Sequence, residues 1–190
     1  MLKLLRPAVS LFIALSVITG IAYPLLTMAV ATQLFGDKAA GSVLVRDGKP
    51  VGSSLIGQNF AAPKYFWGRP SATSPQPYNG TASGGSNQGP LNPALVDAVK
   101  GRVEALKVAD PDNKLAIPVD LVTASASGLD PHISPAAASY QVARVAKVRN
   151  LPTEKLTALI DEHTEGRQWG LFGEPRVNVL DLNLALDAVR

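Results

Sequence analysis

The stretch from Pro7 to Gly36 contains no Asp, Glu, Lys or Arg and is rich in Leu, Ile, Val and Ala. A helix that spans a bilayer needs roughly 20 predominantly apolar residues. We therefore predict a transmembrane helix over residues 8–35, after a short cytoplasmic tail of residues 1–7. Residues 36–190 then form one domain outside the membrane, because about 150 residues suffice for a core of their own.

The charges that flank the apolar stretch predict its orientation. Lys3 and Arg6 precede it, whereas Asp37 and Lys38 cancel each other after it. Because cytoplasmic flanks carry the excess of basic residues, the N-terminus is expected in the cytoplasm and the domain on the extracytoplasmic side.

Small and weakly polar residues interrupt the apolar stretch. Such residues let a second helix approach closely or form hydrogen bonds across to it, and Pro24 predicts a kink. The candidates for packing against a partner helix are Ser16, Thr19, Gly20 and Pro24. The alternative is a solitary anchor that faces lipid only.

A cleaved secretory signal is the competing interpretation of the same stretch. Ala29-Val30-Ala31 resembles a small-x-small cleavage site, which would leave a mature N-terminus at Thr32. Signal peptides have apolar regions of about 7 to 15 residues. The greater length of this stretch favours a retained anchor.

Composition excludes some classes of function. Lys3 and Arg6 lie before the apolar stretch, so the remainder carries 16 basic against 15 acidic residues without a basic run. Nucleic-acid binding needs clustered basic charge, so we expect no nucleic-acid partner. The chain has no Cys, which excludes disulfides and thiolate sites.

The first part of the domain contains a hairpin and a helix. Residues 42–46 and 49–58 flank Asp47-Gly48, a dipeptide that favours a tight β-turn. Asn92-Pro93 is a strong helix start, because Asn caps and Pro suits the first turn. Asp110-Pro111 is expected to end that helix.

The C-terminal part reads as a short strand, two helices, and then a strand followed by a helix. Residues 121–125 have β-type composition, and Ser134-Pro135 starts a helix through about Arg149 that Asn150 ends. Thr153 is expected to cap the next helix, which Gly166 closes. Residues 177–186 fit a short strand and then a helix. Strands without βαβ alternation favour an α+β fold class, a transmembrane helix followed by one mixed domain.

Between Asn59 and Asn92 the periodicity disappears, and Pro and Gly alternate. We expect an ordered irregular loop, because disordered linkers are poor in aromatic residues. The loop either presents aromatic anchors to a partner or folds back over its own core. The partner-contact candidates are Tyr65, Phe66, Trp67, Arg69 and Tyr78.

No catalytic or metal site is signalled by residue spacing. His132 and His163 lie far apart without neighbouring ligands. Ser125, Ser127 and Asp130 have the residue types of a hydrolase triad with His132, but the Gly-x-Ser-x-Gly elbow is missing. The glycine-rich run 83–88 lacks the Gly-Lys-Ser/Thr ending of a phosphate-binding loop, so a mobile turn is the plainer interpretation.

Several blocks in register resemble the C subunit of the bacterial Kdp potassium-transporting ATPase over nearly the whole chain. The blocks are Leu4–Ala8, Thr19-Gly20, Tyr23–Leu26, Ser54–Phe60, Gly68–Ala72, Tyr78-Asn79, Ala82–Asn87, Leu121–Asp130, Arg144–Ala146 and Asn183–Asp187.

The resemblance implies a non-catalytic, single-pass subunit of the bacterial inner membrane. Its implied partners are a channel-like potassium-translocating subunit, a P-type ATPase subunit and a small one-helix subunit. It also implies a catalytic chaperone that raises the ATP affinity of the ATPase subunit. ATP and K⁺ are then handled by the complex, and the chain has no cofactor of its own. The implied nucleotide candidates are Ser83, Gly84, Gly85, Ser86 and Gln141.

The expected orientation keeps these nucleotide candidates away from cytoplasmic ATP, so a scaffold role is the preferred hypothesis. In it, the span packs on partner helices and the domain covers or gates the mouth of the potassium pathway. Trp67→Ala or Arg69→Ala is expected to weaken assembly. The alternatives are an extracytoplasmic binding protein unrelated to transport, and an anchored hydrolase that Ser127→Ala would inactivate.

Overall fold

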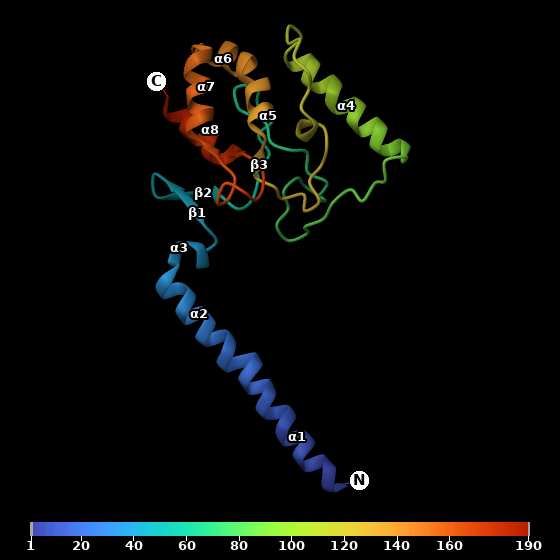
Figure 1. Cartoon of the computed structure of the whole chain (residues 1–190), viewed down its shortest axis with the longest axis vertical. Helices are drawn as coiled ribbons and strands as arrows, with labels where there is room; N and C mark the ends of the chain where they lie inside the picture. The colour runs from blue at the N-terminus through green and yellow to red at the C-terminus, as the bar shows by residue number, and fades with distance from the viewer. Residues whose placement is uncertain (1, 190) are drawn as a thin grey trace. The chain divides into compact units, whose positions relative to one another are not determined.

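The computed structural model describes residues 2–189, and the chain divides into two compact units, Met1–Val51 and Gly52–Arg190. The first is dominated by a long helix, and the second is a mixed domain of helices and a small sheet (Figure 1). The predicted α+β class with one long apolar N-terminal helix is confirmed.

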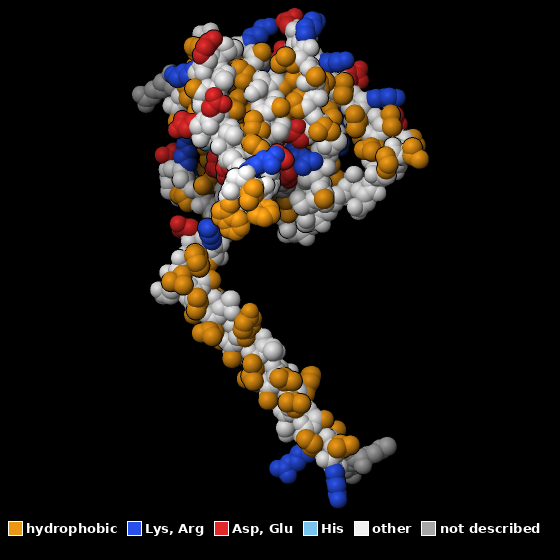
Figure 2. Space-filling model, in the orientation of Figure 1, with side chains coloured by type: hydrophobic (Ala, Val, Ile, Leu, Met, Phe, Trp, Pro, Cys, Tyr) orange, Lys and Arg blue, Asp and Glu red, His pale blue; other side chains and the backbone are white. Residues whose placement is uncertain are grey.

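The long helix of the first unit comprises α1 (Leu2–Val17), the π-helical turn η1 (Ile18–Ala22) and α2 (Tyr23–Leu34). Over Lys3–Leu34 it is apolar and long enough to cross a membrane, and none of its most apolar part is buried. Figure 2 shows hydrophobic side chains along its visible face, with basic side chains at its N-terminal end. The helix already begins at Leu2, so residues 2–7 of the expected tail are helical, and Met1 lies outside the described residues.

The π-helical turn directly precedes Pro24. Proline has no N–H to donate to the preceding turn, and its ring crowds the carbonyl four residues earlier. A π-helical turn widens the helix at this place, so the helical path continues past the proline.

A short helix and a hairpin follow the long helix. They are α3 (Gly36–Ala39), β1 (Val43–Arg46) and β2 (Lys49–Ser53). Asp47 and Gly48 have φ angles of 52° and 73°, as a type I′ turn requires. The predicted hairpin is confirmed, although its second strand ends at Ser53 and not at Gln58.

The sheet of the second unit has three short antiparallel strands in the order β3 (His132–Ile133), β5 (Arg176–Asn178), β4 (Thr164–Glu165). Ile133 and Thr164 both pair with Val177, from opposite sides. Val177 is fully buried. The sheet therefore joins chain segments before and after the helices of residues 135–162.

Helix starts in this unit follow the predicted capping. In α4 (Pro93–Ala109), the Asn92 side chain accepts from the Ala94 N–H, and in α5 (Pro135–Tyr140) the Ser134 side chain accepts from the Ala137 N–H. After a break at Gln141, α6 (Val142–Arg149) ends at Asn150 with φ 54°. The chain then forms α7 (Thr153–Glu162) and α8 (Val179–Ala188).

The core lies where α5–α8 pack together with the sheet. Its fully buried members include Phe66 from the irregular segment, Leu156 and Ile160 from α7, and Leu182 and Leu186 from α8. Figure 1 shows α4 apart from the group α5–α8, and α4 buries only Leu106. Val99 and Val103 of α4 pack against this core but are only partly buried.

Three sequence predictions about elements are wrong. Residues 121–125 are not a strand; the chain forms a 3₁₀ turn, η2 (Val119–Leu121), which buries Leu121. Thr153 is the first helical residue of α7 and Pro152 occupies the cap, while that helix ends at Glu162, before Gly166. The two-residue strands β3 and β4 were not predicted, because they are too short to show alternation.

Candidate functional site

Residues 66 and 67 of the irregular segment are held by two side-chain amides, one from α8 and one from the break between α5 and α6. Asn183 of α8 accepts from the Phe66 N–H at 2.9 Å and donates to the Phe66 carbonyl at 2.9 Å. Gln141 accepts from the Trp67 N–H at 2.8 Å and donates to the Trp67 carbonyl at 3.1 Å. The amides thus act as a neighbouring strand would, and the buried backbone is satisfied without a sheet.

Two arginines of α6 bind residues 63–65 of the same segment. Arg144 donates to the carbonyls of Pro63 and Tyr65 and to Gln141 Oε1, and its guanidinium lies 4.2 Å from the centre of the Trp67 ring. Burial lowers the pKa of Arg144 to about 10, although Asp110 opposes this. The guanidinium therefore stays charged at neutral pH and adds a cation–π contact to its hydrogen bonds.

Arg149, at the end of α6, forms a second clamp. It donates to the Lys64 carbonyl at 2.8 Å and pairs with Asp187 at 2.6 Å. The Tyr65 hydroxyl donates to the other Asp187 oxygen at 3.0 Å. The aromatic part of the loop is thus attached to its own domain at several points.

A second cluster of contacts surrounds Tyr78. Its hydroxyl donates to the Arg69 carbonyl at 2.5 Å. A Cβ at Gly57 would lie 2.4 Å from the Tyr78 ring, and one at Gly68 would lie 2.7 Å from its hydroxyl. Burial raises the pKa of Tyr78 to about 12, with Asp130 adding to the rise and Arg69 opposing it. This tyrosine stays protonated and joins three chain segments.

Arg69 connects this cluster to Asp130. The guanidinium pairs with the carboxylate at 3.0 Å, and the His132 N–H donates to the other carboxylate oxygen at 3.0 Å. Burial acts to raise the pKa of Asp130, but the hydrogen bonds from His132 and Arg69 outweigh it and lower the pKa to about 2. Among the described residues, Arg69 Nε is the buried side-chain polar atom without a hydrogen-bond partner.

The glycine-rich run packs against the segment that begins at Leu121. The Gly84 N–H donates to the Ser127 carbonyl at 2.9 Å, and a Cβ at Gly85 would lie 2.8 Å from the Ala126 carbonyl oxygen. Gly128 has φ +66°, and a Cβ there would lie 2.5 Å from Thr73. Glycine is needed here because two backbones come into contact.

An open hollow of about 370 Å³ lies beside these contacts. Arg102 of α4 reaches it and donates to the Val122 carbonyl at 2.8 Å. Burial lowers the pKa of Arg102. The lining combines aromatic and basic side chains: Phe60, Trp67, Arg69, Tyr78 and Arg102.

The five predicted partner-contact residues lie in one region of the domain, where they contact other residues of their own chain. Phe66 has no exposed surface, so its side chain cannot anchor a partner. Tyr65, Trp67, Arg69 and Tyr78 are partly exposed, and each is bound to its own chain. This geometry corresponds to the loop that folds back over its own core.

The nucleotide candidates differ in their surroundings: Ser83 and Ser86 are exposed, Gly84 and Gly85 are half-buried, and Gln141 is buried. All four hydrogen-bonding positions of the Gln141 side chain are used, by Trp67, Ala137 and Arg144, and its exposed fraction is 1%. Ser83 donates to the Ser127 carbonyl at 3.0 Å, so the run 83–86 and Gln141 bind different parts of the domain. The geometry offers no support for a shared nucleotide site.

The helix-packing candidates lie on the exposed surface of the first unit. Ser16, Thr19, Gly20 and Pro24 are all exposed. The Thr19 hydroxyl donates to the Leu15 carbonyl at 2.8 Å, and no atom lies near a Cβ built at Gly20. The surface around Gly20 is therefore open to a neighbouring helix or to lipid.

The two serines considered for a hydrolase triad, Ser125 and Ser127, line the same pocket as Asp130. Ser125 is buried, and the Ser127 hydroxyl accepts from the Leu129 N–H at 3.1 Å. No group of three or more His, Cys, Asp or Glu side chains among residues 2–189 could hold a metal ion.

Sequence reasoning missed the most exposed aromatic residues of the domain. Trp169 and Phe172 lie in the loop between β4 and β5, with 82% and 60% of their surfaces exposed. The closely spaced Gly166, Gly170 and Gly173 between two short strands were a signal of a hairpin that could have been followed.

Comparison with known proteins gives one consistent result. The family model described as "KdpC: K+-transporting ATPase, c chain" matches residues 5–188. A potassium-transporting ATPase KdpC subunit from Dechloromonas aromatica is 70% identical over 189 residues, covering 100% of this chain and 99% of the relative. KdpC subunits from Polaromonas naphthalenivorans (67%; 100% and 97% covered) and Methylococcus capsulatus (58%; 100% of both) are also similar.

Proposed function

Because the chain belongs to the KdpC family, the c chain of the K⁺-transporting ATPase, we propose that it is the non-catalytic subunit that stabilises assembly of this pump. Its partners in this proposal are the channel-like potassium-translocating subunit, the ATP-hydrolysing subunit and a small one-helix subunit. The chain holds no cofactor of its own, and ATP and K⁺ are bound by the other subunits.

The observation that carries the proposal is the long helix with no buried face. Over Lys3–Leu34 this helix is apolar enough to cross a membrane, yet its surface is not covered by the rest of the chain. An apolar surface of this size must be covered by lipid or by other helices. A separately folded domain joined to such a helix is suited to holding other membrane subunits together.

In the proposed orientation the N-terminus is cytoplasmic and residues 36–190 are extracytoplasmic. Lys3 and Arg6 before the helix support this, because Asp37 and Lys38 after it are balanced. Protease added outside intact spheroplasts is expected to degrade the domain. Full protection of the domain, with degradation only after lysis, would overturn this orientation.

The proposed effect on ATP affinity is indirect. Gln141 is buried and fully hydrogen-bonded, and Gly84 and Gly85 are packed on the chain near Ser127. In this proposal the chain therefore raises the ATP affinity of the ATPase subunit through contacts between subunits and not by binding ATP. Direct nucleotide binding by this chain is the less economical alternative.

Removal of the chain tests the assembly role. The remaining subunits should be purified from membranes that contain or lack this chain, at matched expression. We expect fewer intact complexes without it, and an increased KM for ATP in those that remain. Unchanged yield and unchanged KM would refute the proposal, whereas a changed yield with an unchanged KM would leave assembly as its only role.

A further inference from the structure

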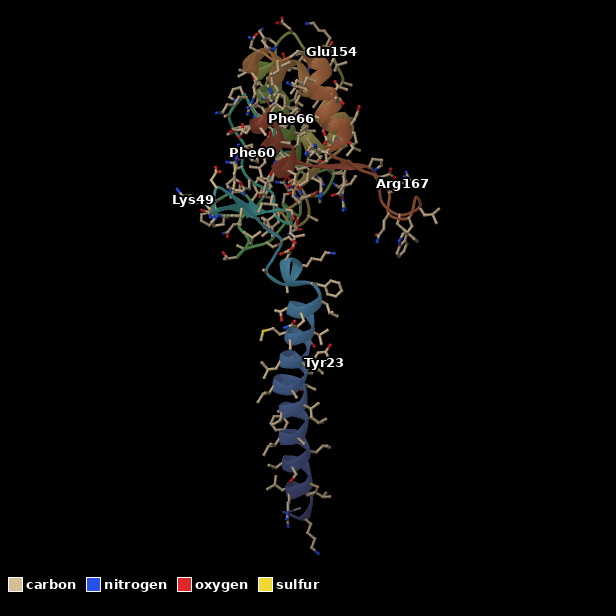
Figure 3. All side chains as sticks on the ribbon, turned by 90° about the vertical axis from the view of Figure 1, so that its left-hand side faces the viewer. Tyr23, Lys49, Phe60, Phe66, Glu154 and Arg167 are labelled. Atoms are coloured by element: carbon tan, nitrogen blue, oxygen red, sulfur yellow. The ribbon has the colours of Figure 1, made fainter. Side chains whose placement is uncertain are left out.

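The loop between β4 and β5 presents apolar side chains to solvent. We call residues 167–174 the hairpin tip. In Figure 3 the segment that carries Arg167 extends away from the rest of its domain. Trp169, Leu171 and Phe172 have exposed fractions of 82%, 74% and 60%. Large apolar side chains grouped at a projecting turn mark an interaction site more often than isolated ones do.

The hairpin tip has a fixed shape. The Gln168 N–H donates to the Phe172 carbonyl at 2.8 Å, and the Phe172 N–H donates back at 3.0 Å. The rings of Trp169 and Phe172 meet edge to face with centroids 6.0 Å apart. Trp169 has φ +54°, a conformation that is unfavourable for a bulky residue. The fold thus maintains a strained turn that displays these side chains.

The charges at the base of the tip compensate each other. Arg167 pairs with Glu174 at 2.6 Å, and Arg176 pairs with Glu165 at 2.9 Å. Protein segments that lie on a bilayer typically carry unpaired Lys and Arg for anionic headgroups. Here each of the two arginines is already paired with a glutamate. An apolar centre with a neutral polar rim is the pattern of a protein–protein contact.

The size of the tip restricts the partner further. Three such side chains offer on the order of 400 Å², whereas a stable interface buries about 800 Å² on each partner. The tip alone is therefore too small to hold a freely diffusing protein. A chain anchored by its own membrane helix needs less contact area, because the anchor raises the effective concentration of a partner in the same membrane.

We propose that the hairpin tip inserts Trp169, Leu171 and Phe172 into an apolar pocket on the extramembrane face of a membrane-embedded partner subunit. This inference rests on the proposed function, since it assumes assembly with the K⁺-transporting subunits. It differs from the sequence-based prediction, which placed the contact at residues 65–78.

Photo-crosslinking in the purified complex tests the contact. Leu171 is replaced by the photoreactive residue p-benzoylphenylalanine, and the cross-linked peptide is identified by mass spectrometry. The matched control is Val108 of α4, which is 77% exposed. We expect a cross-link from position 171 to one partner subunit, with a yield at least about fivefold above that from position 108.

Cross-linking only to lipid, only to a second copy, or equally from both positions would overturn the inference. A chain that co-purifies with its partner subunits but shows no cross-link from position 171 refutes the hairpin contact alone. A wild-type chain that does not co-purify refutes the proposed function and this inference together.

A double variant gives an independent readout. Trp169→Ser with Phe172→Ala removes the two aromatic side chains of the hairpin tip but none of the buried core. We expect an unchanged melting temperature for the chain in detergent and a fall of at least about fivefold in co-purified partner, the size of a lost hot spot. Unchanged co-purification would contradict the contact even if the cross-link were found.

Discussion

The side-chain amide of Gln141 is hydrogen-bonded to both backbone groups of Trp67, at 2.8 Å from the N–H and 3.1 Å to the carbonyl. These residues are 74 positions apart in the chain. The contact attaches the irregular segment to the chain between α5 and α6. It explains why this segment is ordered although it contains no strand. It also removes Gln141 from the set of residues that could bind a ligand.

Replacing this amide should therefore destabilise the domain. Gln141→Leu leaves two partly buried backbone groups of Trp67 unpaired, and a fully buried unsatisfied group costs about 1–3 kcal/mol. Thermal unfolding of the full chain in detergent measures the loss. Ser139→Ala, at an exposed position of α5, is the control and should be nearly neutral. A Gln141→Leu variant as stable as the wild type would show that the amide pairing contributes nothing.

Two adjacent glycines should respond differently to the same substitution. A Cβ at Gly85 would lie 2.8 Å from the Ala126 carbonyl oxygen, whereas one at Gly84 meets nothing within 4 Å. Gly85→Ala is expected to cost about 1–3 kcal/mol, as overpacking does. Gly84→Ala should be tolerated. If the run bound phosphate instead, Gly85→Ala would reduce ligand binding with little change in the free energy of unfolding. That result would support the nucleotide interpretation.

Acid should weaken the contact between Arg69 and Asp130. The pKa of Asp130 falls from 3.8 to about 2 in the folded chain, so the folded state binds this proton less readily than the unfolded state. Its stabilisation, on the order of 2 kcal/mol, is present above about pH 4 and is lost as the pH falls through 2.

Unfolding of the full chain between pH 5 and pH 2 checks this dependence. Asp130→Asn should be less stable than the wild type at neutral pH, and the difference should shrink as the pH falls. The control Asp112→Asn, at a carboxylate that is 86% exposed, should follow the wild-type curve. Parallel curves for the Asp130→Asn variant and the wild type would contradict the assigned ion pair.

Short-range signals predicted much of the fold. Asn92-Pro93 and Ser134-Pro135 start helices as expected, Asp47-Gly48 turns the hairpin, and Asn150 ends α6, because each acts within about four residues of itself. The path of residues 63–67 was not predictable. It depends on Gln141 and Asn183, whose amides lie far away in sequence and look like ordinary helix residues.

The same contrast applies to the candidate site. An aromatic-rich loop is compatible with a partner surface and with a folded-back core, and its sequence does not show that Phe66 is buried while its neighbours Tyr65 and Trp67 are partly exposed. Leu121-Val122 has β-type composition, but its side chains are buried by a 3₁₀ turn. In both cases tertiary packing decided between local alternatives of similar energy.

Gly20 tests whether the long helix packs against a partner helix. No atom of the chain lies within 4 Å of a Cβ built at Gly20, so Gly20→Leu should leave the stability of the domain unchanged. If a partner helix approaches there, the larger side chain should reduce co-purification several-fold. Ala22→Leu, on another side of the helix, is the control. Equal co-purification of both variants with the wild type would indicate an anchor that faces lipid.

The most direct test is a mild-detergent pull-down of the tagged full chain from potassium-starved cells, with mass spectrometry of its partners and of the intact chain. The account predicts the other potassium-pump subunits at stoichiometric yield and a chain that retains residues 1–35. A lone chain that begins near Thr32 would contradict it, because the apolar helix would then be a cleaved signal and not part of a membrane complex.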